Sequence, residues 1–320
     1  MKLFITGGAG FIGINFVQHW LNKHPKDEIT IYDKLTQYAN VNEVMELSHS
    51  NSNLSLVIDD LLNFPRLQDL IRNYDVVVHF AAETHVDDSI KNPKLFIDTN
   101  VLGTSNLLLS TIGTDIEKII YVSTDEVFGQ SDTDEFNEHT SVNPRNPYSA
   151  TKASAEMLAM AYHNTYKVPF IITNAVNNYG PHQYPNKLIP KFILRSLNNL
   201  SLPVYGDGKQ QREWLYVTDH CRAIEYIIEK GDIGNRYCIG TGYKKENIEI
   251  VNEILTKTGR DATLIEHIID RPGHDKSYEV NSSKIRSLGW KPEVGFQEGM
   301  QMTIDWYTHN SRRWQIDDLN

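Results

Sequence analysis

The stretch that decides the fold is Thr6-Gly7-Gly8-Ala9-Gly10-Phe11-Ile12-Gly13, which directly follows a short apolar run. It places Gly7, Gly10 and Gly13 at even spacing and passes into a segment of helical period that reaches about Leu21. Glycines at this spacing allow a tight turn, let backbone N–H groups approach a pyrophosphate and keep the helix close to the strand. The stretch therefore predicts a strand, a loop and a helix that bind a dinucleotide.

An acidic residue follows the second apolar run at the spacing that such a site requires. Asp33 lies 20 residues beyond Gly13. A carboxylate at this place can hold the hydroxyls of an adenosine ribose, and its charge would repel a 2′-phosphate. The pattern thus favours NAD over NADP. A plain strand-to-helix turn followed by an acidic loop residue is the alternative.

Apolar runs alternate with longer segments of helical period over the first half of the chain. The runs cover residues 3–6, 29–32, 54–58, 76–80, 119–122 and 170–173. This alternation is typical of βαβ units and a parallel sheet. We expect a Rossmann-like, doubly wound α/β domain over residues 1–175, with residues 214–240 returning to it. A smaller, interleaved substrate-binding region would cover residues 176–213 and 241–320, where loops rich in Gly, Pro and Asn appear.

Composition excludes several classes of protein. The chain has 320 residues, of which 40% are hydrophobic and 22% charged, and a formal net charge of -10. A phosphate backbone demands a basic surface, so we expect no nucleic acid partner. Two cysteines, Cys221 and Cys238, cannot form a disulfide scaffold or a cysteine metal site. The brief apolar run before the glycines is too short for a signal peptide or a membrane span, and we expect a cytoplasmic protein.

Two adjacent carboxylates follow the apolar run at residues 118–122. The segment Ser123-Thr124-Asp125-Glu126-Val127-Phe128 should emerge at the carboxyl end of that strand, which is where ligands bind in open parallel sheets. An enzyme that only moves hydride needs one acid/base group, so Asp125 and Glu126 indicate a second chemical step such as elimination. A solvated turn or a helix cap is the alternative.

A tyrosine and a lysine share one face of a predicted helix. Tyr148 and Lys152 are four residues apart in a segment of helical period. An ammonium close to a phenol favours the phenolate, which would lower the pKa of the tyrosine and let it take a proton from a substrate hydroxyl. An incidental pair on an amphipathic helix is the alternative.

Basic residues in later loops suit an anionic ligand. Lys187, Arg212 and Arg271 lie in loop-like contexts, and Arg is suited to bidentate phosphate contacts. Each alone is also compatible with an ordinary surface charge. His274 and the other histidines show no metal-ligand spacing, so we assign no metal.

Nine motifs, spread over nearly the whole chain, resemble those of one known family. They are TGGAGFIG (6–13), YDKLT (32–36), HFAAETHVD (79–87), STDEVFG (123–129), NPYSATK (146–152), NNYGP (177–181), NKLIP (186–190), YGDGKQ (205–210) and DRPGHD (270–275). In these motifs the chain resembles the extended short-chain dehydrogenase/reductase family, and within it the nucleotide-sugar 4,6-dehydratases of the dTDP-glucose 4,6-dehydratase type. Related epimerases and decarboxylases share the glycines and the tyrosine–lysine pair but not the paired acids.

The resemblance implies a lyase mechanism. Tyr148, assisted by Lys152 and Thr124, would remove the proton of the C4 hydroxyl while NAD takes the C4 hydride. Glu126 would then abstract the C5 proton as Asp125, held protonated, delivers a proton to the departing C6 hydroxyl. The hydride would return to C6, which regenerates NAD and gives a 4-keto-6-deoxyhexose.

The resemblance also implies binding residues and an assembly. The implied cofactor contacts are Gly7, Gly10, Phe11, Ile12, Gly13, Asp33, Asp60, Leu61, Tyr148, Lys152 and Asn178. The implied substrate contacts are Thr84, Asn177, Lys187, Arg212, Asn247 and Tyr278. A homodimer would form through the Tyr148 helix and a helix near residues 100–110.

Three single positions and one pair depart from the family pattern and leave the nucleotide base open. The family usually has Arg at the position of Asp88, Glu at Asn186, Tyr at Phe128 and a more basic pair at residues 276–277. We expect an NAD-dependent 4,6-dehydratase of an NDP-hexose, with dTDP-glucose as the first candidate. The alternatives are a dehydratase of UDP-glucose or another NDP-sugar, a nucleotide-sugar 4-epimerase, and a catalytically silent NAD-binding protein.

Overall fold

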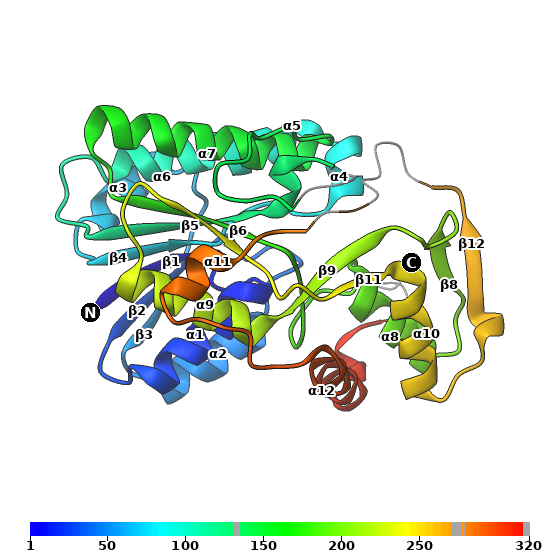
Figure 1. Cartoon of the computed structure of the whole chain (residues 1–320). Helices are drawn as coiled ribbons and strands as arrows, with labels where there is room; N and C mark the ends of the chain where they lie inside the picture. Colours follow the sequence, from blue (N-terminus) through cyan, green and yellow to red (C-terminus); the bar gives the residue numbers. More distant parts are fainter. Residues whose placement is uncertain (131–134, 271–276, 278, 316–320) are drawn as a thin grey trace.

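A parallel sheet forms the centre of the computed structural model, which describes residues 1–130, 135–270, 277 and 279–315 (Figure 1). Within these residues seven strands pair in the order β3-β2-β1-β4-β5-β6-β10, all parallel. The strands are β1 (Lys2–Thr6), β2 (Glu28–Asp33), β3 (Leu54–Ile58), β4 (Val76–His79), β5 (Lys118–Thr124), β6 (Phe170–Ala175) and β10 (Arg236–Ile239). The order reverses between β1 and β4, which makes that junction the switch point where ligands bind in doubly wound sheets.

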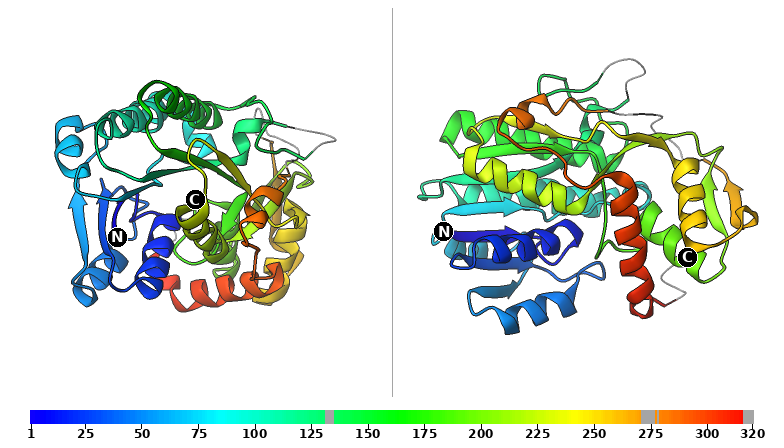
Figure 2. Two further views of the ribbon diagram at one scale, coloured as in Figure 1. Left: turned by 60° about the vertical axis from the view of Figure 1, so that its left-hand side comes forward. Right: turned by 60° about the horizontal axis from the view of Figure 1, so that its bottom comes forward.

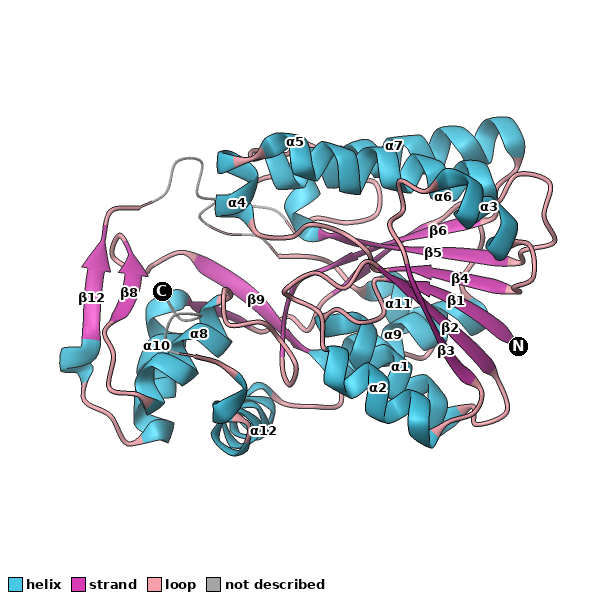
Figure 3. Ribbon diagram, turned by 180° about the vertical axis from the view of Figure 1, so that it is seen from behind, coloured by secondary structure: helices cyan, strands magenta, loops and turns pink. Residues whose placement is uncertain are grey.

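Helices cover both faces of this sheet, as Figure 3 shows from behind. On one face lie α3 (Phe64–Ile71), α6 (Thr104–Ser110) and α7 (Pro147–Tyr166), and on the other α1 (Phe11–Lys23), α2 (Val41–Ser50), α9 (Val217–Lys230) and α11 (Ser283–Ser287). Because both faces are covered, the inner strands read as continuous apolar runs and not as alternating patterns. The predicted doubly wound α/β fold is confirmed.

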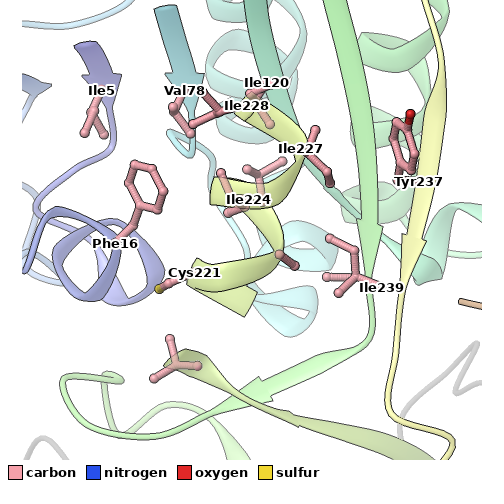
Figure 4. Packing of buried hydrophobic residues seen from close by; sticks show 14 of the residues in the cluster. Ile5, Phe16, Val78, Ile120, Cys221, Ile224, Ile227, Ile228, Tyr237 and Ile239 are labelled. Atoms are coloured by element: carbon pink, nitrogen blue, oxygen red, sulfur yellow. The ribbon is translucent and has the colours of Figure 1, made fainter. Parts of the chain in front are cut away.

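The packing between the sheet and helices α1 and α9 shows how the sequence builds this core (Figure 4). Ile5, Val78 and Ile120 project from neighbouring strands toward the apolar faces of these helices. Ile224 and Ile227 of α9 are three residues apart, so both point toward the sheet. Truncating one such fully buried isoleucine to alanine typically costs about 2–5 kcal/mol of unfolding free energy.

A smaller region covers the carboxyl edge of the sheet (Figures 1 and 2). It contains a three-stranded sheet of β7 (Asn177–Tyr179), β9 (Gln211–Tyr216) and β11 (Lys244–Glu246), and a two-stranded sheet of β8 (Leu202–Tyr205) and β12 (Ile265–Ile268). Helices α8 (Leu188–Leu197), α10 (Asn247–Thr258) and α12 (Phe296–His309) pack on one another in a core of their own. The chain enters this region after β6, returns to the large sheet for α9 and β10, leaves again, and returns once more for α11 before α12.

Short helices complete the description. They are α4 (Val86–Lys91), α5 (Pro93–Phe96), the π-helix η1 (Ile97–Gly103), and the 3₁₀ helices η2 (Asp125–Phe128), η3 (Ala262–Leu264) and η4 (Ser311–Arg313). The sequence patterns did not predict the π-helix, which joins α5 to α6. Across the described part of the chain, every helix is too short or too polar to cross a bilayer.

Candidate active site

One cavity of about 310 Å³ runs along the carboxyl edge of the large sheet, from the glycine-rich loop to the paired acids. It brings together the five expected catalytic residues, all of the expected cofactor residues, and three of the expected substrate residues. Those that line it are Gly7, Gly10, Phe11, Ile12, Gly13, Asp33, Asp60, Leu61, Thr84, Thr124, Asp125, Glu126, Tyr148, Lys152, Asn177, Asn178 and Lys187. Residues separated by up to 180 positions therefore share one site.

The glycine-rich loop leaves no space for a side chain at two of its positions. Gly7 has φ +69°, and a Cβ added there would lie 2.5 Å from the backbone nitrogen of Ala81. A Cβ on Gly13 would overlap the carbonyl oxygen of Gly7, where the first turn of α1 touches the loop. These two positions require glycine, and the first residues of α1 line the cavity, at the end of a helix where the backbone N–H groups have no partner within the helix. This is the arrangement that binds a pyrophosphate.

The Asp33 carboxylate is fixed at the end of β2. Oδ2 accepts a hydrogen bond from the Ala9 backbone at 3.0 Å, and Oδ1 accepts one from Leu35 at 2.9 Å. Burial raises the pKa of Asp33. Each oxygen keeps a second lone pair, so the carboxylate can also accept from the hydroxyls of a ribose. The glycine cradle and this acceptor together fit the diphosphate and adenosine parts of a dinucleotide.

Thr124 organises the two acids at the end of β5. Its hydroxyl donates to Oδ1 of Asp125 at 3.1 Å and accepts from the backbone N–H of Glu126 at 3.3 Å. It thereby caps η2, the short helix on which both acids lie. The side-chain amide of Asn146 donates to Oε2 of Glu126 at 3.3 Å, which connects this acid to the start of α7. The triplet is a helix cap and also faces the cavity.

The environments of the two acids differ. Asp125 is 1% exposed, and its Oδ2 has no hydrogen-bond partner among the described residues. Burial, and then the charges of Glu126 and Glu213, raise the pKa of Asp125 well above its usual value, with Arg212 acting in the opposite direction. Glu126 is only half-buried. The structure thus favours a neutral Asp125 beside a more accessible Glu126.

Tyr148 and Lys152 lie one turn apart on α7, but the structure corrects the expected effect of the lysine. Burial, and then Glu126 and Asp125, raise the pKa of Tyr148, while its hydrogen bond with Thr124 lowers it. The Lys152 ammonium donates to the Val122 carbonyl at 2.8 Å and does not pair with the phenol. Burial also lowers the pKa of Lys152 to about 7. The expected lowering of the Tyr148 pKa is therefore wrong for the protein without its ligands.

Sequence reasoning missed a buried polar network behind the catalytic residues. The Asn174 amide on β6 donates to the Thr124 carbonyl at 2.9 Å and to Oε1 of Glu156 at 2.8 Å. Arg236 on β10 pairs with Oε2 of Glu156 at 2.5 Å. Glu156 is fully buried and lies one turn beyond Lys152 on α7. That i, i+4 spacing was the available signal, but nothing in the sequence predicts the arginine from a distant strand.

The remaining expected substrate residues are more scattered. Lys187 donates from its ammonium to the Thr84 carbonyl at 2.7 Å, at the rim of the cavity. Arg212 is buried on β9, near enough to Asp125 to affect its charge, and Asn247 begins α10, but neither lines the cavity. Tyr278, like Arg271 and His274, lies outside the described residues.

One group of side chains has the composition of a cation site. His24 at the end of α1 and Glu225 and Glu229 on α9 place ligand atoms within 4.8 Å of one another. Glu225 already accepts hydrogen bonds from His24 at 2.9 Å and from His19 at 2.6 Å. None of these residues lines the cavity. Spacing along the chain could not reveal the group, because its members come from two helices.

The strand order, the glycine cradle and the Tyr148–Lys152 helix define the class, an extended short-chain dehydrogenase/reductase. Residues 4–303 match the model of the family described as GDP-mannose 4,6 dehydratase, and the chain belongs to that family.

Relatives and solved structures agree with this assignment. The chain is 43% identical over 307 residues to the low-salt glycan biosynthesis protein Agl12 of Haloferax volcanii, covering 96% of this chain and 98% of the relative. It superposes with a TM-score of 0.96 and 40% identity on DesIV, a dTDP-glucose 4,6-dehydratase of Streptomyces venezuelae with NAD and dTDP bound, over 100% of both chains. A UDP-glucuronic acid 4-epimerase of Bacillus cereus superposes with a TM-score of 0.92 at 28% identity, over 97% of this chain and 100% of the epimerase.

Proposed function

We propose that this protein is an NAD-dependent lyase that dehydrates a nucleotide-linked hexose, with dTDP-glucose as the first candidate, to the 4-keto-6-deoxy sugar. The observation that carries the proposal is the meeting of two carboxyl groups, Asp125 and Glu126, with the Tyr148–Lys152 pair in one cavity. The name and ligands of DesIV support the choice of reaction and of nucleotide.

The cavity residues divide between the cofactor and the sugar. Gly7, Gly10 and Gly13 would hold the pyrophosphate of NAD, and Asp33 its adenosine ribose. Phe11, Ile12, Asp60, Leu61 and Asn178 would complete the cofactor site, and Thr84, Asn177 and Lys187 would contact the substrate. Bound NAD would accept the C4 hydride and later return it at C6. Arg212 and Asn247 remain proposals for the nucleotide end of the substrate.

The protein's own groups perform the proton transfers. Tyr148 takes the proton of the C4 hydroxyl, and the Thr124 hydroxyl can turn from Asp125 to donate to the phenolate. The C4 ketone acidifies the neighbouring C5–H, and Glu126 removes that proton. Asp125, which burial keeps neutral, gives a proton to the C6 oxygen as it leaves as water. One base and one acid are thus required within the same step, and η2 presents both.

A 4-epimerase is the alternative function, because a solved 4-epimerase has a similar structure. It would use the same cofactor site and Tyr148, but it eliminates nothing and has no need of a neutral carboxylic acid beside a carboxylate. The structure gives Asp125 the environment of such an acid, which favours the lyase over both the epimerase and a catalytically silent protein.

One assay tests the proposal. Purified protein is incubated separately with dTDP-, UDP-, GDP- and CDP-glucose, and each sugar nucleotide is analysed by mass spectrometry. Loss of one water, fastest with dTDP-glucose, is the expected result. Loss of water from UDP-glucose alone would mean that the substrate carries uracil and not thymine. A product of unchanged mass with an inverted C4 would establish the epimerase, and no turnover of any sugar nucleotide would indicate the catalytically silent protein.

We infer a homodimer from the outer face of α5–α7. Exposed large hydrophobic side chains gather on these elements, namely Leu95, Ile97, Leu102, Leu109, Met157 and Met160. A face of this kind favours self-association. Light scattering should give the mass of two chains, and charged substitutions at Met157 and Met160 should give that of one.

We also propose the cytoplasm as the place of action, because NAD and nucleotide sugars are available there. For the domains we retain residues 1–175 with a return over 214–240, and the substrate region over the rest. Since β9 pairs inside the smaller region, α9 and β10 supply the elements of that return.

A further inference from the structure

His220 lines the cavity and carries a buried polar atom that has no partner among the described residues. It lies on the first turn of α9 with 0% of its surface exposed, and it lines the cavity beside Asn177 and Asn178. Its Nε2 has no hydrogen-bond partner among the described residues. A buried polar atom without a partner is costly, so this nitrogen points to a ligand group.

The hydrogen bonds around His220 fix its tautomer. The Asn178 amide donates through Nδ2 to the Val176 carbonyl at 2.8 Å, so its Oδ1 is the atom that faces Nδ1 of His220 at 3.0 Å. An oxygen accepts, and Nδ1 therefore holds the hydrogen. Burial lowers the pKa of His220 to about 3, which keeps the ring uncharged. Nε2 is thus a bare, neutral acceptor.

The position of His220 indicates which part of a bound dinucleotide could form a hydrogen bond with it. Asn178 is three residues beyond Ala175, which pairs with Thr124 across the sheet. His220 therefore lies at the catalytic end of the cavity. The proton that Tyr148 takes comes from the C4 hydroxyl and the hydride comes from C4 itself, so the nicotinamide ring must also lie at that end. The only N–H donor on that oxidised ring is the carboxamide NH₂.

We propose that Nε2 of His220 accepts a hydrogen bond from the carboxamide NH₂ of the nicotinamide and so orients the ring for hydride transfer. This inference rests on the proposed binding of NAD. It adds a cofactor-binding residue from α9, outside the glycine-rich loop and outside the motifs of the sequence analysis.

Other polar atoms of the cavity compete for the same donor. Oε1 of Gln183, Oδ1 of Asn177, Oγ of Ser123 and Oδ2 of Asp125 also belong to lining residues and have no partners among the described residues. Of these, the Ser123 hydroxyl and a protonated Asp125 can act as donors. Asn177 is half-buried and can meet water or the sugar, and Gln183 can turn about its flexible chain. The ring of His220 is fully buried and is held by Asn178, so its Nε2 can neither meet water nor turn to another partner.

A cofactor analogue isolates this one hydrogen bond. In 3-acetylpyridine adenine dinucleotide a methyl group replaces the carboxamide NH₂, while the carbonyl remains. The purified holoprotein is equilibrated with equal concentrations of NAD and the analogue, and the bound dinucleotides are released and counted by mass spectrometry. The wild type should prefer NAD by about tenfold, which corresponds to about 1.4 kcal/mol.

Two variants separate the functions of the ring nitrogens. His220→Asn keeps a donor toward Asn178 but has no acceptor at the place of Nε2, so its preference should fall close to one. His220→Gln places an amide oxygen near the position of Nε2 and should recover part of the preference. Thermal unfolding of each variant checks that the fold is intact.

An unchanged preference for NAD in folded His220→Asn would overturn the inference while leaving the proposed function standing. Loss of the preference in Gln183→Met, with His220→Asn unaffected, would assign the contact to Gln183 instead. A wild type that binds neither dinucleotide would instead contradict the proposed function, so the two failures are distinguishable.

Discussion

The hydroxyl of Thr124 donates to Oδ1 of Asp125 over 3.1 Å and leaves Oδ2 as the free oxygen of that carboxyl group. Asp125 is buried, and the charges of Glu126 and Glu213 oppose its ionisation. A proton on Oδ2 removes that cost and is available to a leaving group.

The first prediction concerns stability and requires no substrate. The pKa of Asp125 is raised in the folded protein, so between its unfolded value near 3.8 and its folded value the native state binds more protons than the unfolded state. Stability is then lost as pH rises through that window. Asp125→Asn cannot ionise, so its unfolding free energy relative to the wild type should increase as pH rises above the unfolded value, until Asp125 ionises in the folded protein.

Urea unfolding at several pH values measures this difference, which should grow by up to about 1.4 kcal/mol for each pH unit within the window. Asp69→Asn is the matched control, because Asp69 is exposed and does not line the cavity. Parallel curves for Asp125→Asn and the wild type would show that Asp125 is ionised in the folded protein.

The second prediction separates oxidation from elimination. Glu126→Gln keeps the size of the side chain and an acceptor for the Asn146 amide, but it cannot take the C5 proton. Dehydration should slow by roughly 10²- to 10⁴-fold, while C4 oxidation persists and the near-ultraviolet absorbance of reduced cofactor accumulates on the protein. Dehydration at the wild-type rate would remove Glu126 from the role of base.

Local patterns predicted the fold because they report what each strand and helix buries. The apolar runs over residues 3–6 and 29–32 became β1 and β2, and the order of strand, glycine loop and helix was enough to place a dinucleotide site. Residues 214–217 were harder, because β9 and α9 meet at Tyr216 without a turn residue between them. A strand pattern does not say which sheet the strand joins.

The site was predictable where one short segment supplies its residues, as with Thr124 to Glu126 and Tyr148 to Lys152. It was not predictable where distant segments meet. The pairing of Glu156 with Arg236, and the approach of His220 to Asn178, depend on how strands and helices pack. The expected lowering of the Tyr148 pKa by Lys152 failed for a related reason. Burial raises the pKa of Tyr148, and the Lys152 ammonium donates to the Val122 carbonyl instead of the phenol.

The third prediction concerns the choice of dinucleotide. Asp33→Asn keeps one side-chain oxygen as an acceptor but loses the negative charge beside the adenosine ribose. NAD should bind more weakly, and NADP should gain on NAD by roughly tenfold, because a 2′-phosphate no longer meets a carboxylate. Competition between the two dinucleotides measures the ratio. Asp59→Asn, which also lines the cavity, is the control, and an equal gain there would mean that total charge and not Asp33 sets the choice.

The fourth prediction concerns the buried partner of the catalytic helix. Burial lowers the pKa of Lys152, and Glu156 one turn away partly restores it. Arg236, Asn174, Ser123 and Lys152 face Glu156, and the Val122 carbonyl and the ring of Tyr121, at 4.2 Å, face Lys152. Glu156→Gln removes the one negative charge that supports the ammonium, so the pKa of Lys152 should fall further.

The resemblance assigns Lys152 to assist the Tyr148 phenolate during C4 oxidation, and a lysine that loses its proton at lower pH stops doing so earlier. The alkaline limb of the rate of C4 oxidation should therefore move to lower pH in Glu156→Gln. The variant also leaves Arg236 as a buried charge without its partner, which costs stability and adds a repulsive charge near Lys152. Pairing it with Arg236→Met removes that charge, so the double variant should recover part of the stability and part of the shift. A rate that falls equally at every pH, with the limb unmoved, would mean that Glu156 only supports the fold.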